Sequence, residues 1–175
     1  GNPGTNTVDG WVERATAAAT WAATRDGVGT GVDGTTALSS ASVGSINIGR
    51  TSGTAPPDNF IRLSRFIAVF YNLTSMGADT ISSATYSVFD ESGSLQLNAG
   101  AGNLSKMVLV AATPADAEDN ELVAGDFTQL GTTDFGQSVT QDARTSAAYN
   151  DITLLAAGLT ALTTAKNGNG KAAFG

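Results

Sequence analysis

Residues 60–71, FIRLSRFIAVFY, constrain the fold more than any other stretch of this 175-residue chain. Side chains in a β-strand alternate between two faces, and here both alternating sets become apolar in the second half of the stretch. A strand that is apolar on both faces has to lie inside a fold, with other elements covering each side. The pattern therefore predicts the central strand of a β-sandwich.

Shorter strand patterns occur along the rest of the chain, separated by turn residues at intervals of roughly 8–12 residues. They fall at residues 11–14, 43–49, 81–89, 107–111 and 152–154. In residues 81–89, alternation makes Ala84, Tyr86 and Val88 the expected inward set. This spacing favours an antiparallel sandwich over βαβ units.

One segment near the C-terminus has a helical pattern. Across residues 156–165, Leu155, Leu159 and Leu162 recur at the spacing of one helix face. Residues 15–20, ATAAAT, are rich in alanine, but their interleaved threonines argue against a helix. Residues 20–25 are interpreted as another short structural element, which ends at the turn signal Asp26-Gly27.

Residues 1–10, GNPGTNTVDG, are predicted to be a flexible lead-in that ends in a turn at Asp9-Gly10. Residues 11–175 are then expected to form a single β-sandwich domain. The fold class predicted from the residues is all-β and antiparallel, with one short C-terminal helix.

The composition excludes several kinds of chemistry. The chain has neither cysteine nor histidine, so it has no disulfide, thiolate nucleophile, histidine-based triad or Cys/His zinc site. We expect no enzymatic activity and no cofactor. A glycan-cleaving pair of carboxylates stays an alternative, because Asp and Glu number 16.

Charge narrows the range of partners. The formal net charge is −7, so an acidic surface disfavours nucleic acid and anionic membrane surfaces. No apolar run approaches the ~20 residues that a membrane span requires.

Aromatic side chains give the candidate glycan contacts. Trp21 beside Arg25 and Asp26 is the best candidate, because it is expected at a loop mouth with polar neighbours. Trp11, Tyr86 and Tyr149 are further stacking candidates, although packing in the core is the expected role of most aromatic residues here. The acidic loop DAEDNE, between Asp116 and Glu121, has oxygen ligands for calcium but lacks EF-hand spacing, so a solvated loop is favoured.

Residues 65–89, RFIAVFYNLTSMGADTISSATYSVF, resemble a strand pair of DNRLRE-type carbohydrate-binding-like jelly rolls. They resemble more closely the jelly-roll domains of tailed-phage and prophage virion proteins. Segments 108–115, 122–131 and 149–154 continue the resemblance in the same order, over roughly residues 9–175. It implies an antiparallel jelly-roll β-sandwich. Tyr71 departs from the pattern, since such domains usually have Asp there.

The resemblance also implies a further strand, beginning about where Phe174-Gly175 falls. We therefore expect a sandwich that lacks its final strand, with an open assembly edge at Lys171 and Phe174. The implied function is that of a non-enzymatic virion structural or surface protein, such as a head-decoration or fibre domain.

The expected partners are copies of the same chain, or a capsid or tail protein, and the expected location is the virion surface or the extracellular space. The alternative is a carbohydrate-binding module of a secreted bacterial protein that binds a surface glycan.

Overall fold

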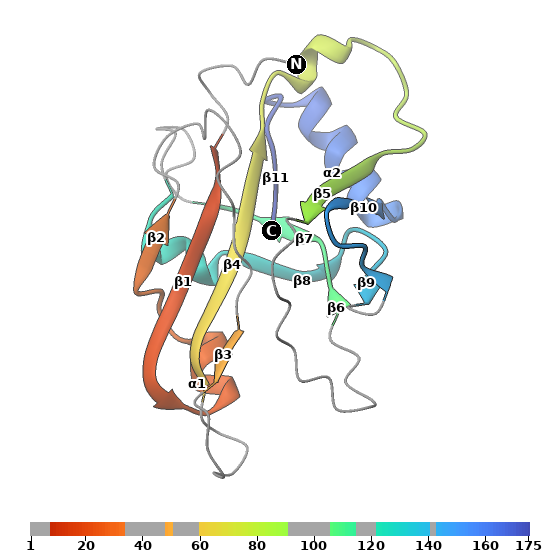
Figure 1. Ribbon diagram of the computed structural model, residues 1–175. Helices are drawn as coiled ribbons and strands as arrows, with labels where there is room; N and C mark the ends of the chain where they lie inside the picture. Colours follow the sequence, from red (N-terminus) through yellow and green to blue (C-terminus); the bar gives the residue numbers. More distant parts are fainter. Residues whose placement is uncertain (1–7, 34–47, 51–59, 91–105, 115–121, 141–142) are drawn as a thin grey trace.

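The computed structural model describes residues 8–33, 48–50, 60–90, 106–114, 122–140 and 143–175. These residues form mainly antiparallel β-sheets with a few short helices (Figure 1). The predicted all-β, antiparallel class is confirmed.

The largest sheet has seven strands in the order β2-β1-β4-β11-β7-β8, and β3 also pairs with β4. Its strands are β1 (Val8–Ala19), β2 (Gly31–Asp33), β3 (Ile48–Arg50), β4 (Phe60–Phe70), β7 (Val110–Ala112), β8 (Leu130–Asp134) and β11 (Ala172–Phe174). The long strands β1 and β4 are paired from Val8↔Val69 to Ala19↔Phe60, with one irregularity near the end. β4 therefore occupies the interior of the sheet, as its sequence predicts.

Two smaller sheets lie beside the main one. β5 (Thr85–Asp90) pairs with β10 (Ala148–Thr153), and β6 (Lys106–Met107) pairs with β9 (Val139–Thr140). The helical elements are α1 (Trp21–Asp26), α2 (Ala156–Asn167) and two short 3-10 helices, η1 (Leu73–Met76) and η2 (Ala124–Thr128). α2 confirms the predicted C-terminal helix and extends it by two residues.

β4 contacts apolar residues on both faces in its second half. Ile67, Ala68 and Val69 are consecutive and almost completely buried. Ile67 and Val69 belong to a first core, whose other buried members are Val12, Leu63, Ala112, Leu122 and Phe127. Because neighbouring side chains on a strand point to opposite faces, Ala68 is buried on the other side.

A second core covers that other side. Its buried residues are Leu109, Ile152, Leu154, Ala172 and Phe174, and Leu159 and Leu162 of α2 pack against them. β11 contributes to both cores, since Ala172 and Phe174 face the second while Ala173 packs on the first. The second core therefore attaches α2 and the β5–β10 pair to the main sheet.

Two sequence predictions for the N-terminal region are wrong. Asp9 and Gly10 do not form a turn, because they lie in β1 and pair with Ala68 and Ile67. The short piece at residues 20–25 is helical, because the Thr20 hydroxyl oxygen caps α1 by accepting a hydrogen bond from the Ala23 amide (3.1 Å).

Other strand predictions are confirmed in part. Residues 107–111 fall into two separate strands, β6 and β7, which belong to different sheets. Of the predicted late strand 152–154, residues 152 and 153 lie in β10, and Leu154 follows it in an isolated bridge to Gly136. Ala84, Tyr86 and Val88 are half-buried while their neighbours are exposed. Of residues 43–49, the structure describes only 48 and 49, which lie in β3. Residues 1–7 and the acidic stretch 116–121 lie outside the described residues.

The open edge expected at Lys171 and Phe174 is also wrong. After α2 the chain reverses, and β11 enters the main sheet between β4 and β7. Phe174 pairs with Ala68 on one side and with Ala111 on the other. A strand with a partner on each side presents no edge for assembly.

A buried lysine connects α2 to the segment that follows η1. The side chain of Lys166 is close to fully buried, and its Nζ donates hydrogen bonds to the carbonyl oxygens of Gly77 (2.8 Å) and Asp79 (2.7 Å). A buried ammonium group requires such acceptors, because an unpaired charge in the interior is strongly unfavourable.

Replacing this ammonium group is expected to destabilise the fold. Lys166→Met removes both hydrogen bonds, and we expect the free energy of unfolding to fall by roughly 1–3 kcal/mol. Lys106→Met, at an exposed position of β6, is the matched control and should have little effect. Urea denaturation of both variants checks this, and equal midpoints for the two would contradict it.

Candidate functional site

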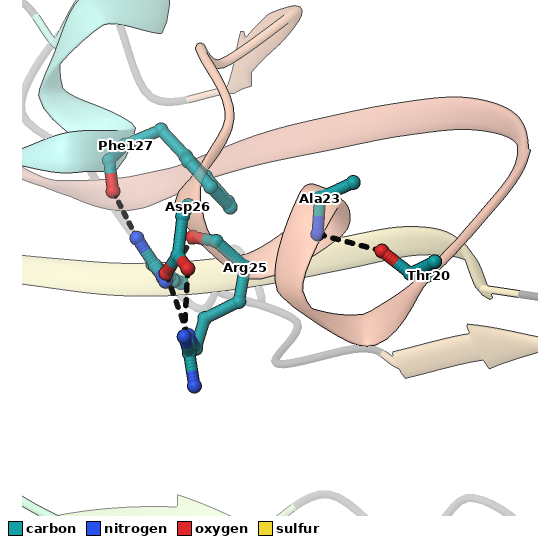
Figure 2. A network of polar contacts seen from close by, with 6 residues as sticks. Thr20, Ala23, Arg25, Asp26 and Phe127 are labelled. Carbon is teal, nitrogen blue, oxygen red and sulfur yellow. Dashed lines mark hydrogen bonds and ion pairs between the residues drawn. The ribbon is translucent and has the colours of Figure 1, made fainter. Parts of the chain in front are cut away.

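The predicted glycan contacts Trp21, Arg25 and Asp26 all lie on α1. Figure 2 shows Arg25 and Asp26 next to each other, near Phe127. The ring of Trp21 is half-buried, and it packs at a tilt against Phe60 with 5.0 Å between ring centroids. It also packs against the first core. Trp21 therefore helps hold α1 on β4 and is not a free stacking platform.

Arg25 and Asp26 are both exposed and pair with each other. Arg25 Nε donates to Asp26 Oδ1, and Arg25 Nη2 donates to Asp26 Oδ2, both at 2.6 Å. The hydrogen bond from Arg25 lowers the pKa of the Asp26 carboxyl, and the same bond raises the pKa of Arg25. A sugar hydroxyl would have to compete with this two-pronged ion pair.

Arg65 of β4 connects α1 to η2 through its guanidinium group. Its guanidinium lies 4.0 Å from the centroid of the Phe127 ring, and it donates hydrogen bonds to the carbonyl oxygens of Phe127 and of Arg25 (2.7 Å). Burial lowers the pKa of Arg65, and the charge of Asp26 partly offsets that effect. The three contacts join β4, α1 and η2, so the α1 region is built mainly for structural support.

The two residues predicted for an assembly edge are engaged within the fold. Phe174 is 4% exposed and contacts the rings of Phe70, Tyr86 and Phe135 at centroid distances of 5.9, 6.4 and 6.2 Å. The ammonium of Lys171 lies 5.6 Å from the centroid of the Tyr71 ring. A shallow depression of about 230 Å³ lies beside Lys171, lined also by Ala112, Thr113, Pro114, Asn169 and Ala173. It is smaller than the usual ligand pocket.

The most distinctive exposed surface is the outward face of the β5–β10 pair. Phe89 and Tyr149 are opposite each other in the register, and they are 50% and 69% exposed. Their rings meet edge to face, with centroids 5.1 Å apart and an angle of 68° between the planes. The two adjacent rings form a small exposed aromatic patch that a ligand can cover.

Polar groups continue the same face along the strands. Ser87 pairs with Asp151 in the register, and its hydroxyl donates to Asp151 Oδ1 at 2.6 Å. The next pair outward is Thr85 with Thr153, also exposed. We call these six residues the β5–β10 face.

The inner side of these strands anchors that face. Ile152 is buried in the second core, and Tyr86 packs against the same core. The Asn150 side chain accepts a hydrogen bond from the Thr145 amide (2.8 Å) and donates to the carbonyls of Thr145 (3.0 Å) and Ala148 (3.2 Å). The outward side chains therefore project from a well-supported backbone.

Sequence reasoning located this face only in part. It named Tyr149 as a stacking candidate but did not single out Phe89. The signal was present, because an inward set of Ala84, Tyr86 and Val88 places Phe89 on the outward set. The pairing of β5 with β10 could not be predicted from the sequence, because the paired residues are far apart in the chain; Ser87 and Asp151, for example, are 64 residues apart.

The chain matches no protein-family model, no curated protein and no solved structure. Among the described residues, no group of three or more acidic, histidine or cysteine side chains is placed to hold a metal ion. No helix in those ranges is both long enough and apolar enough to cross a membrane. A functional conclusion therefore depends on the geometry of the exposed surfaces.

Replacing Arg65 or Arg25 with methionine tests which of the two arginines stabilises the fold. We expect Arg65→Met to lower the free energy of unfolding by roughly 1–3 kcal/mol, because hydrogen bonds to two carbonyls and a cation–π contact are lost. Arg25→Met is the control and should leave the denaturation midpoint almost unchanged, since its ion pair with Asp26 lies at the surface. A larger loss in the Arg25 variant would refute this division of roles.

Proposed function

We propose that the protein is a non-enzymatic structural or surface protein of a virion, such as a head-decoration or fibre domain. It acts by assembling with copies of itself or with a capsid or tail protein, on the virion surface or otherwise outside the cell. The observation that supports this most directly is an exposed edge of the main sheet.

That edge is β8, the last strand in the order of the seven-stranded sheet; β2 lies at the other end. In the part of the chain that the structure describes, β7 is its only paired neighbour. Gly131, Thr132, Thr133 and Asp134 are exposed along it. Its sequence, LGTTD, contains none of the lysines or prolines that commonly block pairing at sheet edges.

An edge strand presents backbone N–H and C=O groups along the side where, among the described residues, it has no strand partner. A strand from another chain satisfies them, which is the most economical way to extend a sheet between molecules. Small hydroxyl-bearing side chains allow close approach and add hydrogen bonds. The edge therefore supports assembly through strand addition at β8.

The composition supports the same proposal. Ala, Gly, Ser and Thr make up about half of the chain, and charged residues only 14%. A surface of small hydroxyl side chains with few charges suits extended, hydrated contacts between protein subunits. The resemblance of residues 65–89 to virion jelly rolls adds the virion context.

We further propose that the layers correspond to a jelly-roll sandwich. The main sheet and the β5–β10 pair lie on opposite sides of the second core, as two layers of a sandwich do. This arrangement supports the finer fold assignment that the sequence resemblance implies.

The alternative function, a carbohydrate-binding module of a secreted bacterial protein, has one observation in its favour. The β5–β10 face combines exposed aromatic rings with hydroxyl and carboxylate groups. This property does not require the assembly role, and the two can be tested separately.

Assembly through β8 is tested with a charge at the edge. We expect the native chain to form oligomers and Thr133→Lys to shift them toward monomers, because a lysine on an edge strand must lose its hydration to allow pairing. Ser83→Lys adds the same charge at an exposed position outside the strands and serves as control. Sedimentation velocity over a range of concentrations measures both.

Two outcomes would overturn the assembly proposal. One is a native chain that stays monomeric at every concentration. The other is an equal effect of Thr133→Lys and Ser83→Lys, because this would show a response to net charge and not to the edge.

A further inference from the structure

We propose that the β5–β10 face is a binding site for an uncharged oligosaccharide. The face consists of three cross-strand pairs in consecutive outward positions of one two-stranded sheet: Phe89 with Tyr149, Ser87 with Asp151, and Thr85 with Thr153. This inference deepens the alternative carbohydrate-binding function and rests on it, and it does not depend on the assembly role.

The spacing of the pairs follows from strand geometry. Residues opposite each other have Cβ atoms about 4.5–5.5 Å apart. Successive outward pairs are separated by two residues, or about 6.6–6.8 Å along the strands. The aromatic pair, the Ser87–Asp151 pair and the threonine pair therefore form a continuous row along the two strands.

The aromatic rings and the polar groups of the face match two different surfaces of a hexose. One side of a pyranose ring presents C–H groups, which pack against an aromatic ring such as that of Tyr149. Its edge carries hydroxyls, which need hydrogen-bond partners. The Asp151 carboxylate accepts from Ser87 through Oδ1 and keeps further acceptor capacity, and the threonine hydroxyls both donate and accept.

Charge decides between possible ligands. The six residues of the face include one carboxylate and no cation, and the whole chain has a net charge of −7. Sulfated, uronic-acid or phosphorylated ligands would meet electrostatic repulsion there. The charge pattern therefore favours an uncharged glycan.

Most side chains of the face are polar. Four of the six carry a hydroxyl or a carboxylate, the groups that sugar hydroxyls need as hydrogen-bond partners. The strands that carry the rings are anchored on the inner side, by Tyr86 of β5 and by Asn150 and Ile152 of β10. A pre-organised site loses less conformational entropy when it binds a flexible oligosaccharide.

The test titrates the full chain with hexaoses of glucose, mannose, galactose, xylose and N-acetylglucosamine, and with hexagalacturonate as a charged comparison. Isothermal titration calorimetry measures affinity. We expect at least one uncharged hexaose to bind, and hexagalacturonate not to bind. Tyr149→Ala and Phe89→Ala should each weaken binding about tenfold, as expected when a stacking contact is lost.

Further variants separate binding from folding. Tyr149→Phe keeps the ring and should retain most of the affinity, while Asp151→Ala should reduce it because a hydrogen-bond acceptor is lost. Met76→Ala removes another exposed apolar side chain, on η1 and outside the six residues of the face, and should bind as the native chain does. Thermal denaturation confirms that each variant is folded.

Three results would overturn the glycan proposal. The first is no binding of any of the five uncharged hexaoses, and the second is binding that Tyr149→Ala leaves unchanged. The third is a change of oligomeric state in Tyr149→Ala without glycan binding, which would make the face a contact between copies. Thr133→Lys should bind glycan normally, so failure of the glycan proposal and failure of assembly through β8 are distinguishable.

Discussion

The fold depends on burial of β4 on both of its faces. Ile67 and Val69 face the first core, while Ala68 is buried on the opposite side of the same strand. A strand of this kind requires apolar cover on each side, and the chain supplies it from distant segments. Val12, Leu122 and Phe127 cover one face, and the second core covers the other.

The second core in turn determines where the β5–β10 face lies. Phe174 packs against Phe70, Tyr86 and Phe135, and these aromatic contacts join β11, β4 and β5. Ile152 enters the same core from β10. Because the inner residues of β5 and β10 are held there, alternation turns Phe89 and Tyr149 outward. The exposed aromatic pair is thus a direct consequence of the buried packing beneath it.

At least five of the nine cationic residues make contacts within the protein. Arg14, Arg25, Arg62, Arg65 and Lys166 each make a hydrogen bond or an ion pair within the protein. The protein as a whole carries a net charge of −7, and its surface includes hydroxyl groups and a few exposed aromatic rings. Such a surface suits uncharged and hydrogen-bonding partners better than anionic ones.

The sequence by itself determined the local features whose side chains repeat with a clear period. Residues 60–71 predicted the central strand, residues 156–165 predicted α2, and alternation in residues 81–89 predicted the inward set around Tyr86. The absence of cysteine and histidine excluded whole classes of chemistry. Only the tertiary structure decided that α1 is helical, that β11 enters the middle of the sheet, and that Phe89 meets Tyr149. The physical reason is that periodicity shows which face of a segment is buried but not which distant segment covers it, and a strand of three residues is too short to have a period.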